Sequence, residues 1–207
     1  MNEHWLERWQ EGRIGWHEAE GNASLQKHWA ASGKRVLVPL CGKTRDLIWL
    51  ERQGNAVVGV ELSDIAAKAF FDENEIAYTR IEGSFTSYIA EGRSITVHCG
   101  DYFEFSDGPF DAYYDRGALV AIPPDRRARY VEHTRSLLAA NASRLIICLE
   151  YDDSIATGPP FPVPAKELLS YWPDLARVDA YDDIENGPPK FREAGLNEMI
   201  EVVWQYP

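Results

Sequence analysis

The sequence predicts an α/β fold in which a mostly parallel sheet is covered by helices on both faces. Short β-branched runs, such as RVLVP at 35–39 and AVVGV at 56–60, have the apolar pattern of buried strands. The segments between such runs begin with capping residues and end near glycine or proline, as helices do. Strands that alternate with helices favour crossover connections, and therefore a parallel sheet.

Two short helices are predicted before the first strand. In residues 3–10, Trp5 and Trp9 stand four positions apart and therefore share one face of a helix. Residues 22–32 form the second helix, with an asparagine or a serine near its start as the cap.

The remaining elements follow in alternation. Strands are predicted at 35–39, 56–60, 95–99, 110–114 and 145–149. Helices are predicted at 44–53, 63–74, 123–140 and 165–171, with Thr44 and Ser63 as caps of the first two. The C-terminal run 196–206 alternates enough for one long antiparallel edge strand, paired with a strand near 177–180. The sheet would then have seven strands.

Composition and charge favour a soluble, single-domain protein. The chain has 207 residues, and no run approaches the roughly 18 apolar residues of a membrane span. Its start, MNEHWLERWQEGR, has no apolar signal core, so we expect a cytoplasmic protein. The net charge of −12 repels phosphate backbones, which argues against nucleic acid as a partner. We expect a monomer.

The cysteines and histidines predict neither disulfides nor a metal site. The three cysteines, Cys41, Cys99 and Cys148, are odd in number and far apart. No cysteine pair has the spacing of a zinc site, and the histidines form no HxxxH pair. We expect Cys99 and Cys148 to be buried among apolar residues, and Cys41 to pack beside a ligand loop.

The first strand end, PLCGKT, is not a phosphate-binding loop. Ligands of such sheets lie outside the carboxyl ends of the strands, so the residues after each strand matter most. Gly42 and Lys43 are similar to the end of a P-loop, but Leu37 stands where that motif needs glycine. A GxGxxG fingerprint is also absent, which disfavours a pyrophosphate ligand and an NAD-dependent oxidoreductase.

The other strand ends carry polar residues suited to an adenosine. Glu61 follows the second strand, where a carboxylate can accept hydrogen bonds from both ribose hydroxyls. Asp101 follows the third, and Tyr102 or Phe103 would pack on an adenine ring. Arg116, after the fourth strand, would hold a carboxylate or steer an anionic substrate. Together they favour S-adenosylmethionine over NAD.

Five stretches then resemble the thiopurine S-methyltransferases, a class I S-adenosylmethionine-dependent family. They are WQEGRIGWH (9–17), VLVPLCGK (36–43), VVGVELS (57–63), YDRGALVAIPP (114–124) and YDDSIATGPPFPVP (151–164). The resemblance covers nearly the whole chain in the family's order. It implies a Rossmann-like class I methyltransferase fold over 1–207, with 1–33 as a helical lid over the cofactor and 34–207 as the core.

The resemblance also implies roles for particular residues. Cofactor contacts fall on Trp9, Leu40, Glu61 and Arg116, with Asp101 and Tyr102 flanking the adenine. Trp16 stands on the substrate side, where the family usually has phenylalanine, and its larger indole would narrow the pocket. Arg116 would contact the substrate as well as the cofactor.

The implied reaction moves a methyl group from S-adenosyl-L-methionine to the sulfur of a small, thiopurine-like thiol, leaving S-adenosyl-L-homocysteine. Thiols ionise more readily than hydroxyls, so no strong base is needed. Asp115 is the best side-chain candidate for taking a proton if its carboxylate faces the pocket, and Arg116 would favour a thiolate.

Other functions fit the same pattern. Acceptors of another kind include alkyl thiols, halide and inorganic selenium or tellurium species. A non-catalytic module that binds an S-adenosyl ligand would carry the same strand ends.

Overall fold

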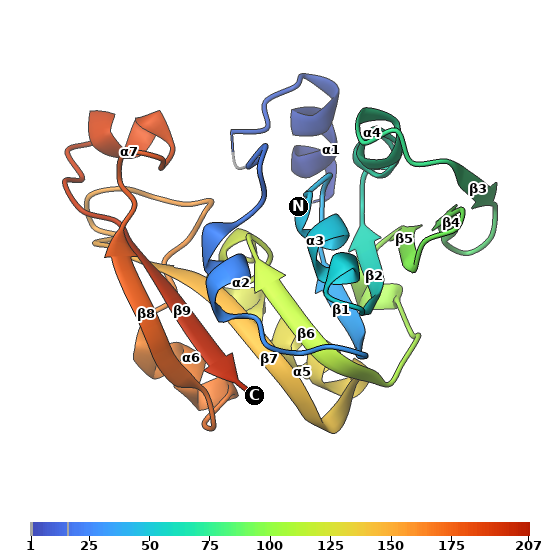
Figure 1. Ribbon diagram of the computed structural model, residues 1–207. Coiled ribbons are helices and arrows are strands. Elements are labelled where there is room, and N and C mark those ends of the chain that lie inside the picture. The colour runs from blue at the N-terminus through green and yellow to red at the C-terminus, as the bar shows by residue number, and fades with distance from the viewer. Residues whose placement is uncertain (1, 16) are drawn as a thin grey trace.

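The computed structural model describes residues 2–15 and 17–207 (Figure 1). The strands are β1 (Arg35–Pro39), β2 (Ala56–Glu61), β3 (Tyr78–Ile81), β4 (Thr86–Ala90), β5 (Ile95–Cys99), β6 (Phe110–Arg116), β7 (Leu138–Glu150), β8 (Ala176–Asp182) and β9 (Ile200–Tyr206). The helices are α1 (Asn2–Gln10), α2 (Ala23–His28), α3 (Asp46–Arg52), α4 (Asp64–Glu73), α5 (Arg127–Leu137), α6 (Ala165–Tyr171) and α7 (Pro189–Glu193).

The strands form one sheet in the order β3-β4-β5-β2-β1-β6-β7-β9-β8. Its five central strands, from β5 to β7, are parallel, and the two strands at each margin are antiparallel. The predicted mostly parallel α/β fold with an antiparallel C-terminal strand is confirmed. In the described residues, however, the sheet has nine strands rather than seven.

The structure differs from the local predictions in several places, and the second helix, expected to reach residue 32, ends at His28. The hairpin β3–β4 was missed because most of its side chains are at least partly exposed, which leaves no apolar run. The predicted edge strand, β9, lies between β7 and β8, and the exposed β8 forms the edge. The helix expected to continue to 140 ends at Leu137, because pairing with β6 overrides the helix propensity of the alanine-rich segment that follows.

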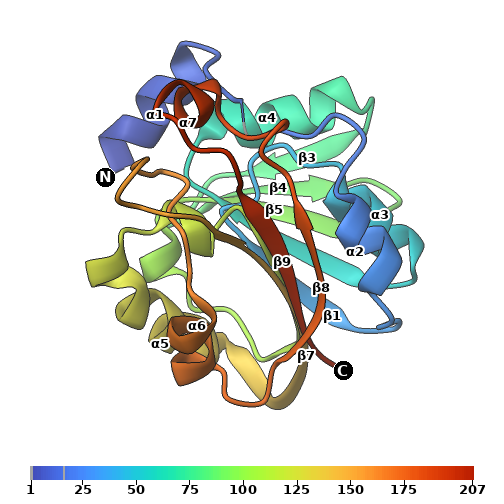
Figure 2. The ribbon, with the colours of Figure 1, turned by 90° about the vertical axis from the view of Figure 1, so that its left-hand side faces the viewer.

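Alternate residues of the central strands enter different cores on the two faces of the sheet. One core joins Tyr113 and Ile146 to α5 and α6, and the other joins Tyr114 and Leu145 to α2, α3 and α4. Figure 2 shows these two groups of helices on opposite sides of the sheet. Adjacent residues at a strand end therefore project into different surroundings.

The N-terminal helix lies near the carboxyl ends of the parallel strands. Figure 1 shows α1 beside α4, beyond the ends toward which β2 and β6 point, and the two helices are in contact. No helix within residues 2–15 and 17–207 is both long and apolar enough to cross a membrane. Cys148 is buried as predicted, whereas Cys99 is only partly buried.

Candidate active site

The turn between β1 and α3 has an unusual backbone. Leu40 has φ +47° and Gly42 has φ +54°, both in the left-handed region. A leucine there is disfavoured, so its surroundings must hold it in place, and such positions concentrate at functional sites. The Cys41 N–H donates to the Val60 carbonyl at 3.1 Å and ties the turn to β2.

Trp9 covers this turn from the N-terminal helix. The indole is 8% exposed, and a Cβ at position 42 would lie 3.2 Å from its ring. Glycine therefore favours both the close approach and the positive φ. Cys41 packs on β2 in the same way, since a Cβ on Gly59 would lie 2.7 Å from its sulfur. Its predicted packing position is thus observed.

Glu61 is the buried acid at the end of β2. Its Oε2 accepts the Gly42 N–H at 2.7 Å and its Oε1 accepts the Ser63 N–H at 2.8 Å, and the residue is 6% exposed. Burial raises the pKa of this carboxyl group, and the backbone hydrogen bonds oppose that shift. Each carboxylate oxygen has a second lone pair. Backbone N–H groups therefore fix the carboxylate in place, and its remaining lone pairs can accept from a further donor.

The end of β5 has a different geometry from the one predicted. Asp101 accepts the Phe103 N–H at 3.0 Å and an N–H of the Asn2 side chain at 3.0 Å, so it anchors the start of α1. Tyr102 is buried, with its hydroxyl 2.9 Å from Thr134 Oγ1. Its ring therefore lies in the core, and a ligand at this strand end would meet the backbone of Tyr102.

Asp115 faces the core. Its Oδ2 accepts hydrogen bonds from the hydroxyls of Tyr113 and Tyr130, and its Oδ1 accepts the Leu119 N–H at 3.0 Å. The residue is fully buried. Asp115 was expected to take a proton only if its carboxylate faced the pocket. The carboxylate faces the core instead, so that condition is not met. The carboxylate instead fixes the end of β6 against α5.

Arg116 projects to the opposite face from Asp115. It is ion-paired with Glu18, from the segment after α1. Asp46 lies on the same face, where it accepts the Asn22 N–H at 2.7 Å and the Tyr114 hydroxyl at 2.9 Å. The sequence interpretation singled out neither Glu18 nor Asp46. Asp46 had a weak signal as an acid in the first turn of α3, and Glu18 had none.

Two hollows lie outside the strand-end residues. One, of about 420 Å³, borders the site between residues 17–20, the β1–α3 turn and the end of α4. There the Lys43 ammonium donates to both carboxylate oxygens of Glu73 at 2.8 Å, so Lys43 ties the turn to α4.

Trp16, predicted on the substrate side, lies outside the described residues.

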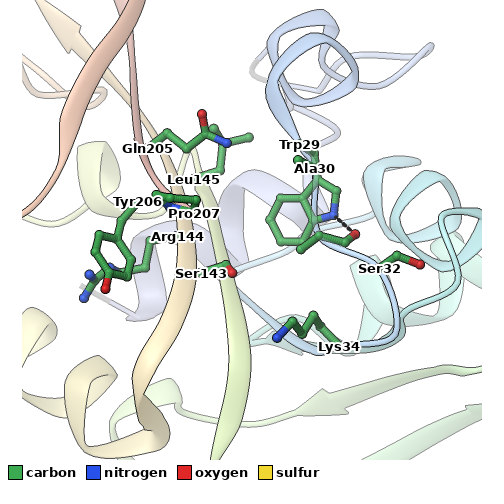
Figure 3. Close-up of a pocket in the computed structure, with 11 residues that line it drawn as sticks. Trp29, Ala30, Ser32, Lys34, Ser143, Arg144, Leu145, Gln205, Tyr206 and Pro207 are labelled. Atoms are coloured by element: carbon green, nitrogen blue, oxygen red, sulfur yellow. Dashed lines mark hydrogen bonds between the residues drawn. The ribbon is translucent and has the colours of Figure 1, made fainter.

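The second hollow, of about 270 Å³, lies beside the amino end of β1. Figure 3 shows Trp29 and Lys34 on one side of it, and Tyr206 and Pro207 on the other. The Trp29 indole N–H donates to the Ala31 carbonyl at 2.8 Å. This second hollow is remote from the carboxyl ends of the strands, where ligands of parallel sheets bind.

Comparison with known proteins identifies the family of this chain. Residues 1–206 match the thiopurine S-methyltransferase family. The thiopurine S-methyltransferase of Pseudomonas syringae pv. syringae is 41% identical, over 97% of this chain and 94% of that protein. The Pseudomonas putida enzyme of the same name is also 41% identical, over 97% and 96%.

A solved structure shares the fold at low identity. It is the 1,6-didemethyltoxoflavin-N1-methyltransferase of Burkholderia thailandensis, which was crystallised with 1,6-didemethyltoxoflavin and S-adenosylhomocysteine. The TM-score is 0.64 at 19% identity, over 99% of this chain and 86% of that one. The chain thus belongs to the thiopurine S-methyltransferase family and is an S-adenosylmethionine-dependent methyltransferase of Rossmann-like fold.

Proposed function

We propose that the enzyme methylates the sulfur of a small, thiopurine-like thiol. The observation that carries the cofactor half of this proposal is the buried Glu61 carboxylate, held by two backbone N–H groups at the end of β2. The acceptor half is supported by the name that the curated relatives share, thiopurine S-methyltransferase.

The residues at the strand ends fit an adenosine ligand that has no phosphates. Glu61 would hold the ribose hydroxyls, and the backbone of Leu40 and Gly42 would meet the amino-acid part. Asp101 and the backbone of Tyr102 would border the adenine. When bound, S-adenosylmethionine supplies a methyl group that is already activated by a sulfonium. Because this ligand has no pyrophosphate, the turn between β1 and α3 needs no glycine-rich phosphate-binding loop.

The protein's own part in the reaction is alignment and exclusion of water. Trp9 covers the turn, and an aromatic face attracts a positive group such as a sulfonium. The acceptor sulfur forms the new carbon–sulfur bond, the electron pair of the broken bond stays on the donor sulfur, and the thiol proton passes to solvent. Asp115 supports the end of β6 as a positioning residue, and Arg116 borders the acceptor.

We assign residues 1–33 to a lid and residues 34–207 to the core that it covers. Contacts that support a lid join Asn2 to Asp101, Trp9 to Gly42 and Glu18 to Arg116. We further propose that the protein is cytoplasmic, because its three free cysteines suit a reducing compartment. We also propose that it is a monomer.

Turnover with a panel of acceptors tests the proposed function. The panel is a thiopurine, a small alkyl thiol, a halide and inorganic selenium and tellurium species, and S-adenosylhomocysteine release is measured for each. We expect the thiopurine to be methylated and Glu61→Ala to reduce that turnover. Methylation of the halide or the inorganic species without the thiols would replace the proposed acceptor.

A further inference from the structure

The positive charge of Arg116 is partly compensated by a neighbouring carboxylate. Arg116 ends β6, and its guanidinium is ion-paired with the carboxylate of Glu18, which also accepts a hydrogen bond from the Asn22 side chain at 3.2 Å. The side chains of Arg116 and Glu18 are 24% and 33% exposed, so the pair is largely withdrawn from water. The attraction is therefore screened less than in a surface pair.

Two further carboxylates lie on the same face. Arg116 is the register partner of Ile147, which is paired in turn with Val203 of β9. Glu201 stands two residues before Val203 and so shares its face of the strand. It is buried, and its Oε1 accepts hydrogen bonds from the hydroxyls of Tyr181 and Ser24.

Asp46 joins this group from the start of α3, held by the Asn22 N–H and the Tyr114 hydroxyl. Burial raises the pKa of Glu18, and Arg116 opposes that shift. Burial lowers the pKa of Arg116, but the attraction of the carboxylates, Glu18 first among them, outweighs burial and leaves that pKa raised. One guanidinium thus stands among three carboxylates, and Glu18 is the one in direct contact with it.

We propose that Glu18 determines the charge preference of the acceptor site. By pairing with Arg116 near Asp46 and Glu201, it disfavours acceptors that carry a negative group beyond the reacting sulfur and favours neutral or cationic ones. This inference rests on the proposed function. In protein surroundings a unit charge about 8 Å away changes the affinity of a charged group by about tenfold or more.

The test compares two aromatic thiols that differ in one charge, para-sulfanylbenzoate and para-sulfanylbenzamide. We expect Glu18→Gln to raise the ratio of kcat/KM for the benzoate over the benzamide about tenfold. Glutamine keeps the size of the side chain and an oxygen that can accept from Arg116 and Asn22. The matched control is Glu20→Gln in the same segment, because Glu20 is highly exposed and pairs with Arg45 at 3.6 Å. It changes the net charge equally, and we expect the ratio to stay within about twofold.

An unchanged ratio in Glu18→Gln, or an equal rise in Glu20→Gln, would overturn the inference. If the natural protein methylated neither thiol, the sulfur-acceptor function would fail instead. The charge preference would then be tested by calorimetry on the S-adenosylhomocysteine complex, with para-(methylsulfanyl)benzoate and para-(methylsulfanyl)benzamide as probes. The same tenfold shift in relative affinity would support it, and no shift would refute it.

Discussion

Asp115 and Arg116 are adjacent in the chain but act on different faces of the sheet. Asp115 receives its hydrogen bonds from Tyr113, Tyr130 and Leu119 in one core, while Arg116 pairs with Glu18 on the other face. The sequence DRG indicates that both residues end a strand, and the period of two along a strand separates them. We therefore propose that Asp115 supports the strand and that Arg116 borders the acceptor.

Asp115→Ala should cost stability rather than chemistry. The substitution leaves two tyrosine hydroxyls and a backbone N–H without their buried acceptor, which should destabilise the fold by about 2–4 kcal/mol. Urea unfolding measures this loss. In the folded fraction we expect kcat to fall less than about tenfold. A stable variant that has lost nearly all kcat would instead make Asp115 the base.

Glu61 should make cofactor binding sensitive to pH. Its pKa is raised by burial, so as the pH falls it takes up a proton above 4.5, the ordinary value for a glutamate. The protonated carboxyl group accepts hydrogen bonds from the ribose hydroxyls poorly. We therefore expect the affinity for S-adenosylhomocysteine to fall with pH, beginning above 4.5, in calorimetric titrations.

Substitution of the same residue provides the comparison. Glu61→Ala should weaken S-adenosylhomocysteine binding by about 1–3 kcal/mol at neutral pH, the cost of unpaired hydroxyls. Glu61→Gln should lose the acid branch of the pH dependence, because an amide does not titrate there. Equal affinities for all three proteins would mean that Glu61 faces away from the cofactor.

At the scale of elements, the central strands and the C-terminal pair β8–β9 could be predicted, whereas the hairpin β3–β4 could not. The central strands are buried on both faces and have continuous apolar runs, as in VLVP and AVVGV. The hairpin β3–β4 and the position of β8 at the edge of the sheet depend on pairing with neighbours, which no local pattern records. The positive φ of Leu40 was not predicted either, and it accompanies a tertiary contact, the hydrogen bond from the Cys41 N–H to β2.

We expect the helix α1 to become more ordered when the cofactor binds, because Trp9 covers the turn beside the cofactor site. Trp9→Ala removes the buried indole that covers Gly42, so we expect weaker S-adenosylhomocysteine binding and faster hydrogen exchange at residues 2–10. The matched control is Gln10→Ala, an exposed position on the same helix. If both variants bound S-adenosylhomocysteine like the natural protein, α1 would not be a lid.

At the scale of the whole molecule, the residues at the strand ends could be predicted, whereas the group of carboxylates around Arg116 could not. Residues that end parallel strands meet at one edge of the sheet, so Glu61, Asp101 and Arg116 follow from topology. The carboxylates around Arg116 come from a loop, a helix start and an antiparallel strand. Their meeting depends on tertiary packing, which sequence spacing does not show.

Ligand-induced stabilisation should separate the S-adenosyl ligand from NAD. At a concentration of about 100 times its Kd, a ligand adds about 2.7 kcal/mol of stability, or roughly 5–10 °C in Tm for a domain of this size. We expect S-adenosylhomocysteine to produce this shift in thermal unfolding and NAD to produce none. A shift with NAD alone would contradict the assignment of the strand ends to an adenosine without phosphates.

The central claim is that the transferred methyl group ends on sulfur. Incubation of the enzyme with S-adenosylmethionine carrying an isotope-labelled methyl group and a thiopurine offers both sulfur and ring nitrogens as acceptors. The NMR chemical shift of the labelled methyl distinguishes the products. We predict a single S-methyl thioether, formed together with an equal amount of S-adenosylhomocysteine. Methyl on a ring nitrogen, or no labelled product, would contradict the claim.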